Sequence, residues 1–455
     1  MKIIIVGCGK IGSALTEMLS QEGHDISIID LHEEIVNEIS TNFDTMGVTG
    51  NGASYNILME AGIESAHLLI AVTGSDELNL LCCLIAHKAG NCKTIARVRN
   101  PIYNKESKFI KDELGLSMII NPEYESACEI TRLLRFPSAI KIDTFHKGRV
   151  ELLNFRVEAD SILANMEIKE IAKKLKCDVL VCTAERGDEV IIPNGNFVIR
   201  PNDIISIVAS HGKAVEFFVK IGLIHNPVKN AMLIGGGAIS YYLAEQLLSS
   251  GISVKIIEQD LKRCEELTEL LPDAMIIHGD GTDQDLLLEE GLEDIQSFAS
   301  LTGMDEENVL LSLYARTKSK GKIITKINRI SFDNVINSLN LDSVIYPKYV
   351  AAEYIVQCVR AMNNSIGSNV ETLYKIKKNK AEALEFCVSD NSKLIGIPFE
   401  KLNLKENLLI CSITRKGKII TPKGQDHLEK DDHVIVVTTN QGLHDIGDIL
   451  RGYGL

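Results

Sequence analysis

The chain alternates short apolar runs with amphipathic stretches. Its first third places runs rich in Ile, Val and Leu at 2–6, 25–29, 45–49, 67–72, 94–98 and 117–120, and amphipathic stretches at 11–21, 32–41, 53–61, 76–89 and 103–113. Continuous apolar runs of this length indicate buried parallel strands, and a 3.6-residue period indicates helices that cover them. A further helix is predicted from Pro122 to about Leu134, since proline suits a first helical turn. We therefore predict an α/β fold with a Rossmann-type parallel sheet.

The second half of the chain repeats the first. Gly7 and Gly235 lie 228 positions apart, and so do Asp30 and Glu258. Gly50 and Gly279, and then Thr73 and Thr302, lie 229 positions apart, so a single inserted residue explains the series. Self-similarity at a fixed period indicates a duplicated structural unit. A second Rossmann-type sheet is therefore predicted, ending in a helix from Pro347 to about Val359.

A different sequence pattern, of short strand-like segments and hairpin turns, follows each predicted sheet. Strand-like segments read VELLNFRV, VLVCTAER, EVIIP and DIISIVAS in 150–222, around a short predicted helix at 167–174, and residues 214–221 end the unit. In 382–455 the corresponding segments read EALEFCV, LLICSITRKGKIITP and HVIVVTT. Such hairpins indicate a small α+β module after each sheet. The segments 223–230 and 363–381 are predicted to be linkers. The predicted domains are 1–137, 138–225, 229–362 and 370–455.

Composition excludes several classes of protein. The net charge of −14 leaves no basic footprint for nucleic acid or for anionic lipid. No apolar stretch approaches 18 residues, so direct membrane insertion is not expected. The eleven cysteines form no C-x-x-C pair, which favours reduced thiols in the cytosol. Cys83 and His87 have helical i,i+4 spacing, but two such residues are more often core and edge residues than metal ligands, and no metal is predicted.

The first apolar run leads into the glycine-rich loop Gly7-Cys8-Gly9-Lys10-Ile11-Gly12. In a G-x-G-x-x-G loop the first glycine permits the tight turn, the second lets backbone approach a pyrophosphate, and the third lets the helix pack on the strand. Asp30 ends the second strand, where a carboxylate accepts hydrogen bonds from ribose hydroxyls. This acid disfavours a 2′-phosphate, so the residues predict NAD or NADH rather than the phosphorylated cofactor.

Four further positions follow predicted strands of the first sheet. Thr73 and Gly74 close the fourth strand, at the crevice where open α/β sheets bind ligands. Arg97 ends the fifth strand and suits a phosphate, with a surface salt bridge as the alternative for it and for Arg99. Asn51 follows the third strand, and both an adenine contact and a plain turn remain open for it.

The second copy keeps most of this pattern. It reads Gly235-Gly236-Gly237-Ala238-Ile239 and then Ser240 in place of the third glycine. The serine affects helix packing more than phosphate contact. The remaining candidate site residues of this copy occupy the counterpart positions: Glu258, Asp280, Thr302 and Lys326. A second nucleotide site and a degenerate structural copy are both compatible with this pattern.

The small modules show no obvious catalytic histidine with a carboxylate partner, no G-x-S-x-G and no metal cluster. A dehydrogenase needs a proton-transfer group near its nicotinamide, and no segment indicates one. A non-enzymatic protein is therefore expected. An NAD-dependent oxidoreductase and a soluble small-ligand sensor remain as alternatives.

Over its full length the chain resembles a known family. The loop MKIIIVGCGKIG, then Asp30, GNGAS, VTGSDELN and ARVRNP, a small module, and the whole unit again, is similar to the TrkA family of Trk potassium uptake systems, which has tandem RCK (KTN) domains. The resemblance implies a cytoplasmic regulatory subunit, peripheral on the inner face of the membrane. It implies binding of NAD(H), ATP and ADP, and homo-oligomers (dimer or tetramer ring) that gate an integral membrane potassium-translocating subunit.

The resemblance also assigns site residues. It places the phosphate loop on Gly7, Cys8, Gly9, Lys10 and Ile11, the ribose carboxylate on Asp30, the strand-four contacts on Thr73 and Gly74, and the basic contact on Arg97. In the second copy the same roles fall on Gly235, Gly236, Gly237, Ala238, Ile239, Glu258, Thr302 and Lys326. Ser240 and the lysine at 326 depart from the family pattern. The small modules resemble RCK C-terminal domains, and their ligand is not indicated.

Overall fold

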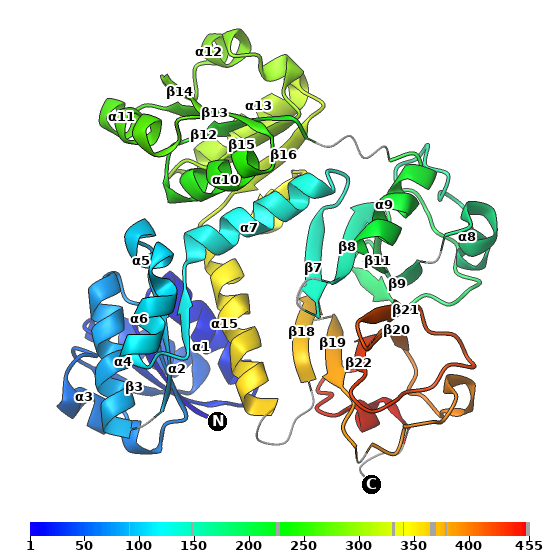
Figure 1. Ribbon diagram of the computed structural model, residues 1–455, viewed down its shortest axis with the longest axis horizontal. Helices are drawn as coiled ribbons and strands as arrows, with labels where there is room; N and C mark the ends of the chain where they lie inside the picture. Colours follow the sequence, from blue (N-terminus) through cyan, green and yellow to red (C-terminus); the bar gives the residue numbers. More distant parts are fainter. Residues whose placement is uncertain are drawn as a thin grey trace. The chain divides into compact units, whose positions relative to one another are not determined.

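A computed structural model gives the fold of the 455-residue chain (Figure 1). It describes residues 1–90, 92–146, 149–177, 179–223, 228–329, 333–339, 341–364, 370–377, 380–390 and 392–451. The chain forms two compact units, each built from both sequence repeats. Unit 1 contains Met1–Thr131 and Lys229–Cys358, and unit 2 contains Arg132–Val228 and Val359–Leu455.

The first half of unit 1 is a six-stranded parallel sheet in the order β3-β2-β1-β4-β5-β6. Its strands are β1 (Lys2–Val6), β2 (Asp25–Asp30), β3 (Met46–Thr49), β4 (Leu68–Ala71), β5 (Lys93–Arg97) and β6 (Met118–Ile120). Its helices are α1 (Lys10–Gln21), α2 (Glu33–Phe43), α3 (Tyr55–Glu60), α4 (Asp76–Gly90), α5 (Pro101–Lys105), α6 (Ser107–Leu114) and α7 (Pro122–Arg135), with the 3-10 turn η1 (Ile63–Ser65). This order is that of a Rossmann sheet, as predicted.

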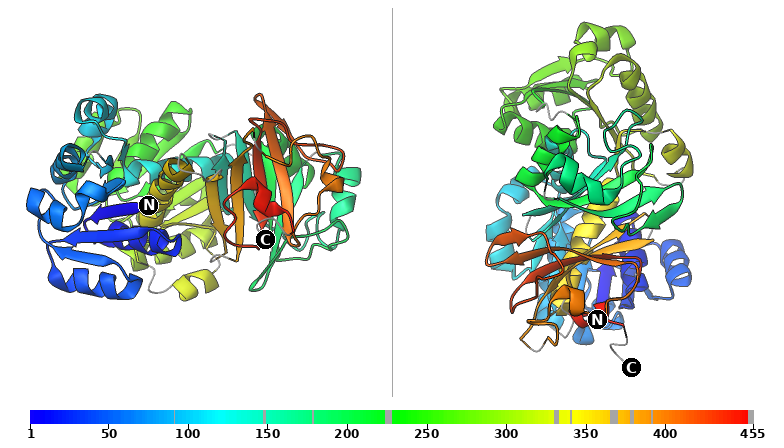
Figure 2. Two further views of the ribbon diagram at one scale, coloured as in Figure 1. Left: turned by 90° about the horizontal axis from the view of Figure 1, so that it is seen from below. Right: turned by 90° about the vertical axis from the view of Figure 1, so that its right-hand side faces the viewer.

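Burial on both faces explains the apolar runs. Ile3, Ile4, Ile5 and Val6 of β1 are all buried, although successive side chains point to opposite faces. Both faces must therefore be covered, and helices lie on each (Figures 1 and 2). The stretch predicted as one helix at 103–113 is instead two short helices, α5 and α6.

The second half of unit 1 repeats this sheet in the order β14-β13-β12-β15-β16-β17, again parallel throughout. Its strands are β12 (Asn230–Ile234), β13 (Ser253–Glu258), β14 (Met275–His278), β15 (Ser297–Ser300), β16 (Lys322–Lys326) and β17 (Ser343–Ile345). Its helices are α10 (Ala238–Ser249), α11 (Leu261–Leu270), α12 (Gln284–Glu289), α13 (Asp305–Lys318), α14 (Asp333–Ser338) and α15 (Pro347–Asn364), with the 3-10 turn η2 (Leu292–Asp294). The predicted duplication of the Rossmann sheet is confirmed.

Each copy contributes its last helix to the other copy. On α7, the ring of Tyr124 packs edge-on against Tyr242 of α10 at a centroid distance of 5.5 Å. Asn121, just before α7, donates a 2.9 Å hydrogen bond to the hydroxyl of Tyr242. In the reverse direction, α15 lies beside α1 of the first sheet (Figure 1). The two Rossmann copies are therefore joined by exchanged helices.

Unit 2 contains two antiparallel five-stranded sheets in the orders β10-β9-β11-β8-β7 and β18-β19-β22-β20-β21. The first module comprises β7 (Lys141–Phe145), β8 (Val150–Arg156), α8 (Ile168–Leu175), β9 (Leu180–Arg186), β10 (Glu189–Ile191), β11 (Ile204–Ser210) and α9 (His211–Lys220). The second comprises β18 (Val370–Ile376), β19 (Ala381–Cys387), η3 (Phe399–Lys401), β20 (Leu408–Arg415), β21 (Lys418–Ile420), β22 (His433–Thr438) and η4 (Ile446–Ile449). Two small α+β modules were predicted, and both are present.

Three details of these modules differ from the prediction. The segment 363–381 is not all linker, because 370–376 forms β18, an antiparallel partner of β19. Its buried Val370, Tyr374 and Ile376 are separated by polar residues that hide the strand signal. The matching strand β7 was also missed. In the second module, one-turn 3-10 elements stand where the first has α8 and α9. Of the predicted linker 223–230, residues 224–227 lie outside the described residues.

The two small modules share one core within unit 2 (Figure 2). Phe145 and Leu152 of the first module pack in the same cluster as Ala383 and Ile435 of the second. The hydroxyl of Tyr374 also donates a 2.8 Å hydrogen bond to the carbonyl of residue 144. All eleven cysteines are free thiols in the structure. Within the described part of the chain, no helix combines the length and apolarity needed to cross a membrane.

Candidate functional site

The glycine-rich loop of the first copy turns sharply between β1 and α1. Gly7 has φ +95°, and a Cβ there would lie 2.8 Å from the amide nitrogen of Thr73, so only glycine fits. A Cβ on Gly12 would lie 1.9 Å from the carbonyl oxygen of Gly7, which explains the third glycine of the motif. Gly9 is different, because a Cβ there would have no protein atom within 4 Å. Its backbone faces the open cleft.

Asp30 at the end of β2 holds this loop in place. Its Oδ2 accepts a 2.7 Å hydrogen bond from the amide of Cys8, and its Oδ1 accepts one of 3.0 Å from the amide of His32. Burial alone would raise the pKa of Asp30, but these amides and the His32 ring lower it below its usual value. Burial, and then Asp30 itself, raise the pKa of the Cys8 thiol to about 12, so this cysteine is a neutral loop residue.

A buried asparagine joins the ends of β4 and β5. Asn79 accepts hydrogen bonds from the amide and the hydroxyl of Thr73, at 2.8 and 2.7 Å. It also donates one of 2.9 Å to the carbonyl of Arg97. The Arg97 guanidinium donates from Nη1 to the carbonyl of Thr73 at 3.2 Å, while its Nε is buried with no hydrogen-bond partner among the described residues. Arg97 therefore retains an unsatisfied cationic donor beside the cleft.

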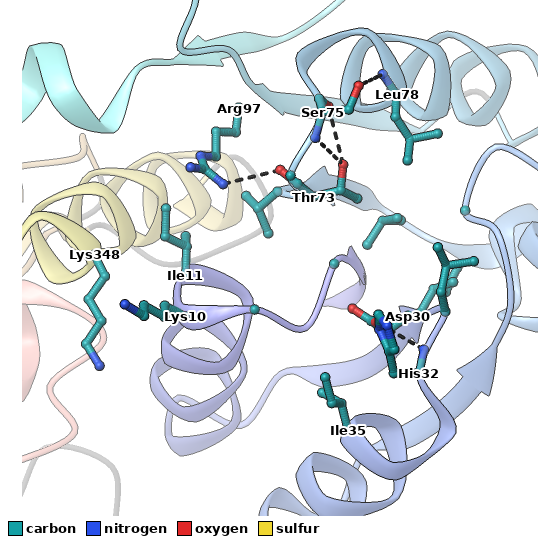
Figure 3. Close-up of a pocket in the computed structure, with 18 of the residues that line it drawn as sticks. Lys10, Ile11, Asp30, His32, Ile35, Thr73, Ser75, Leu78, Arg97 and Lys348 are labelled. Carbon is teal, nitrogen blue, oxygen red and sulfur yellow. Dashed lines mark hydrogen bonds and ion pairs between the residues drawn. The ribbon is translucent and has the colours of Figure 1, made fainter. Parts of the chain in front are cut away.

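These residues line one cleft of about 550 Å³ at the carboxyl ends of the strands. Gly7, Gly9, Lys10, Ile11, Asp30, Asn51, Thr73, Gly74 and Arg97 all line it, so the structure brings these predicted residues together. Asp30 and His32 lie at one end, and Lys10 lies toward the other (Figure 3). Cys8 and Gly12 support the loop.

The second copy also contributes to the wall of this first cleft. Asn328, Pro347 and Lys348 line it together with the first-copy residues. Lys348 is the second residue of α15 and lies next to Lys10 (Figure 3). Burial, and then the charge of Lys10, lower the pKa of Lys348. The cleft therefore has a cationic end built from both copies, which sequence reasoning missed because the helix exchange leaves no local signal.

The second glycine-rich loop repeats the acid contact and the open second glycine of the first. The amide of Gly236 donates a 2.6 Å hydrogen bond to Glu258, and a Cβ on Gly237 would again have no atom within 4 Å. Asn308 repeats the role of Asn79, accepting from the amide of Thr302 at 2.9 Å and donating to the carbonyl of Lys326 at 3.0 Å. Burial lowers the pKa of Lys326, whose Nζ donates to the carbonyl of Leu301.

Ser240 replaces the third glycine without disrupting the turn. Its side chain is fully buried, and its hydroxyl donates a short hydrogen bond to the carbonyl of Gly235. In the first copy, a Cβ on Gly12 would collide with the corresponding carbonyl of Gly7. The two loops therefore differ in how closely the helix approaches the turn, and this affects packing, as the sequence suggested.

The remaining candidates take part in local structure. Asn51 accepts from the amide of Ala53, and Asp280 accepts from the amide and hydroxyl of Thr282. Ala238 and Ile239 form the first turn of α10. Arg99 donates to the carbonyl of Gly74 at 2.6 Å. Asn79 was missed as a functional residue, although its recurrence as Asn308 at the repeat offset was a usable signal.

The fold and cleft define a duplicated Rossmann protein in which a small β module follows each sheet. The TrkA-N domain model matches residues 3–122 and 231–347, and the TrkA-C domain model matches residues 152–218 and 383–451. The chain belongs to the TrkA family of Trk system potassium uptake proteins.

Relatives that match over nearly the full chain are named Trk system potassium uptake protein TrkA. The chain is 30% identical over 444 residues to Trk system potassium uptake protein TrkA homolog 1 of Methanosarcina mazei, covering 96% of this chain and 97% of the relative. It is 28% identical to TrkA of Haemophilus influenzae, covering 97% of this chain and 96% of the relative. The resemblance drawn from the motifs is therefore confirmed.

Solved structures share the fold at low identity. A crystal structure of the GsuK RCK domain aligns with a TM-score of 0.62 at 15% identity, covering 97% of this chain and 92% of that chain. A structure described as GsuK channel bound to NAD has the same TM-score and identity, and covers 77% of that chain. The tandem arrangement of Rossmann-type and small modules is thus the RCK fold.

Proposed function

We propose that this protein is a nucleotide-binding regulatory subunit that gates a potassium-translocating membrane protein. The observation that carries the proposal is the pair of glycine-rich loops. Each is anchored to an acid at the end of the second strand, and each presents a glycine to open space. Family membership supports the link to potassium uptake. We further propose the domain boundaries 1–137, 138–225, 229–362 and 370–455.

The ligand we propose for the first cleft is NAD or NADH, with ATP and ADP as competing ligands. The cleft is lined by Asp30, suited to ribose hydroxyls, and by Lys10, Lys348 and Arg97, suited to phosphates, with Glu123 also on its wall. The GsuK channel structure, which is described as bound to NAD, supports the same class of ligand. The second loop is proposed to bind a nucleotide as well.

Regulation would follow from the shared wall of the first cleft. A ligand shifts a conformational equilibrium only by its difference in affinity for the two states. A nucleotide phosphate near Lys348 contacts the start of α15, a helix of the other copy. We infer that nucleotides with different phosphate groups set different relations between the two Rossmann copies. The oligomer, a homodimer or homotetramer ring, then passes this change to the membrane partner from the cytoplasmic side.

Calorimetric titration with NAD, NADH, ATP and ADP tests the proposal. Gly9→Ala and Gly237→Ala add one methyl group to the surface of each loop without touching another protein atom. We expect each to weaken binding at its own site by at least about tenfold while leaving the thermal midpoint unchanged. Gly212→Ala is the matched control, because its Cβ also meets no atom but lies in the small module.

Two outcomes would contradict the proposal. Unchanged nucleotide affinity in both loop variants would show that the loops are structural. Unchanged potassium flux through the reconstituted membrane subunit, at saturating concentrations of every nucleotide, would remove the regulatory role. The enzymatic alternative is tested separately by incubating the protein with NAD and a panel of hydroxy acids and amino acids, where we expect no reduction of the cofactor.

A further inference from the structure

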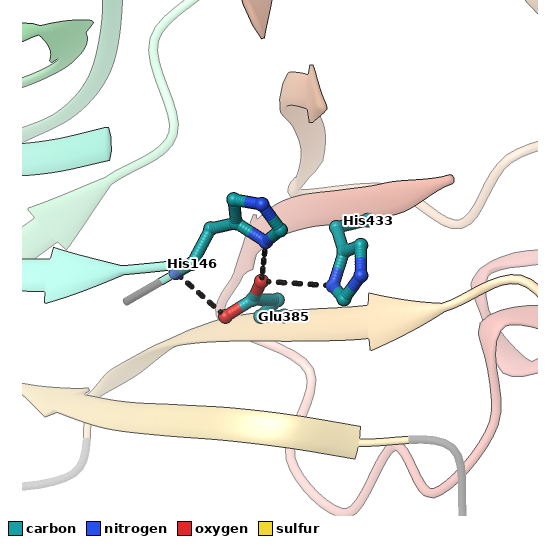
Figure 4. A group of neighbouring side chains, drawn as sticks. All are labelled: His146, Glu385 and His433. Carbon is teal, nitrogen blue, oxygen red and sulfur yellow. Dashed lines mark hydrogen bonds and ion pairs between the residues drawn. The ribbon is translucent and has the colours of Figure 1, made fainter. Parts of the chain in front are cut away.

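Two histidines and a glutamate converge where the two small modules meet in unit 2. His146 follows β7 of the first module, whereas Glu385 on β19 and His433 on β22 belong to the second (Figure 4). The Nδ1 atoms of His146 and His433 lie 3.5 and 3.2 Å from the same oxygen, Oε1 of Glu385. Their ligand atoms all lie within 4.8 Å of one another.

The carboxylate at the centre of this cluster is fixed and buried. The side chain of Glu385 is only 2% exposed. Its second oxygen, Oε2, accepts hydrogen bonds from the amide of His146 at 3.1 Å and from the hydroxyl of Thr372 at 3.0 Å. Because Oε2 is occupied, Oε1 is the atom aimed at the two rings. The rings remain partly open to solvent, which provides an entry path.

The spacing matches a coordination sphere. Bonds of about 2.0–2.1 Å from Zn²⁺ to nitrogen and oxygen at tetrahedral angles separate neighbouring ligand atoms by about 3.3 Å. The two nitrogen–oxygen distances of 3.5 and 3.2 Å bracket this value. Glu371 is a neighbour of one ligand only, since its Oε2 lies 2.8 Å from Nδ1 of His433, and it does not belong to the group formed with His146 and Glu385. Cys387 also lies within reach of His433 and Glu371.

The internal repeat shows that the fold does not require these residues. In the first module, Asn154 and Ile204 stand at the strand positions equivalent to Glu385 and His433. At the end of β18, Lys377 stands at the position equivalent to His146, and both have left-handed backbone conformations. The pseudo-symmetric location therefore cannot coordinate a metal, although its backbone is the same. The carboxylate and both imidazoles are therefore present at only one of the two positions that the repeat makes equivalent.

We propose that His146, Glu385 and His433 form a binding site for a divalent first-row transition metal, with Zn²⁺ as the fitting ion. Two imidazoles and a carboxylate suit Zn²⁺, Ni²⁺ or Co²⁺ and are a poor set for Mg²⁺ or Ca²⁺, which prefer oxygen ligands. The ion would join the turn after β7 of the first module to the sheet of the second. This site is independent of the nucleotide clefts.

The charges of the acids and the two histidines in this cluster affect one another. Glu371 and Glu385 both face His433 and raise its pKa to about 10, so a proton supplies the positive charge between the acids. Burial, and then the charge of His433, lower the pKa of His146.

The test uses the full-length, tag-free protein after treatment with a chelator. Titration with ZnCl₂ by calorimetry, and with CoCl₂ by visible absorption, is expected to show one high-affinity site per chain and the ligand-field bands of tetrahedral Co²⁺. Excess MgCl₂ or CaCl₂ should not displace the ion. Glu385→Asn and His433→Ile introduce the residues of the first module at the same positions, so both variants are expected to fold. Each should weaken Zn²⁺ binding at least about tenfold.

His427→Gln is the matched control, because His427 is a partly exposed histidine of the same module that lies 3.9 Å from Glu429. It should leave the Zn²⁺ and Co²⁺ titrations unchanged, and circular dichroism verifies the fold of each variant. Absence of a stoichiometric site in the wild-type protein would overturn the proposal and leave the cluster as an ion-pair network. Equal binding by folded Glu385→Asn and wild type, or loss of binding in His427→Gln, would also overturn it.

Discussion

The amide of Cys8 donates a 2.7 Å hydrogen bond to the carboxylate of Asp30, and this contact ties the glycine-rich loop to the end of β2. The second copy makes the same contact between Gly236 and Glu258 at 2.6 Å. In each copy the acid positions the loop, and in the first copy it also lines the cleft. Hydrogen bonds to a charged acceptor are stronger than neutral ones, so the loop geometry depends on the carboxylate.

Asp30→Asn should therefore weaken nucleotide binding at the first cleft. The side-chain amide keeps the size of the acid but places an N–H group against one of the two backbone amides that Asp30 accepts. We expect affinity for NADH to fall about tenfold, which is about 1.4 kcal/mol. Asp25→Asn, at the exposed start of the same strand, should leave affinity unchanged. Calorimetric titration distinguishes them, and equal affinities in both variants would show that Asp30 has no part in binding.

Lys348→Ala tests whether the second copy contributes to the first cleft. Removing the cation should weaken ATP binding about tenfold, while a nucleoside without phosphate should bind as before. Lys320→Ala, an exposed lysine of the same copy, serves as the control. If ATP and adenosine respond equally, Lys348 does not contact the phosphates, and the proposed coupling between the copies fails.

Substitution at the third glycine position should lower the unfolding free energy more in the first copy than in the second. Gly12→Ser would place a Cβ 1.9 Å from the carbonyl of Gly7, so we expect a loss of about 2–3 kcal/mol in unfolding free energy. Ser240→Gly removes a buried hydroxyl and its hydrogen bond to Gly235, which should cost about 1 kcal/mol. Urea denaturation measures both. Equal losses would contradict the difference between the two loops.

A buried acid in the first small module makes stability depend on pH. Both oxygens of Asp203 accept hydrogen bonds from Arg186, at 2.9 and 2.7 Å. Burial would raise the pKa of Asp203, but Arg186 and the amide of Arg200 lower it below its usual value. A lowered pKa in the folded state stabilises the protein above the unfolded value of about 3.9, and this contribution is lost as pH falls through the folded value.

Asp203→Asn should accordingly reduce the unfolding free energy at pH 7 by about 1–3 kcal/mol, with the difference from wild type shrinking below about pH 4. Asp390→Asn removes an exposed partner of Lys430 and should change stability by no more than about 0.5 kcal/mol. Urea denaturation at neutral and acid pH checks both expectations. A constant difference across this range would mean that the charge of Asp203 does not contribute.

Much of the first cleft was predictable because its residues follow strands of a parallel sheet. The carboxyl ends of such strands meet at one edge, so Gly9, Asp30, Thr73 and Arg97 come together by topology alone. Strand β18 was not predictable in the same way. Its buried residues alternate irregularly with polar ones, and its stability comes from pairing with β19, which a local pattern does not reveal.

The sequence by itself determined the duplication, the two Rossmann sheets, the two small modules and the glycine-rich loops, because each rests on local periodicity or on a spacing that recurs. Only the tertiary structure decided that α7 and α15 are exchanged, so that Lys348 reaches the cleft of the other copy. It also decided that His146 meets Glu385 and His433, which are more than 230 positions away. Contacts of this kind arise from packing between distant segments, and no local pattern in the chain encodes them.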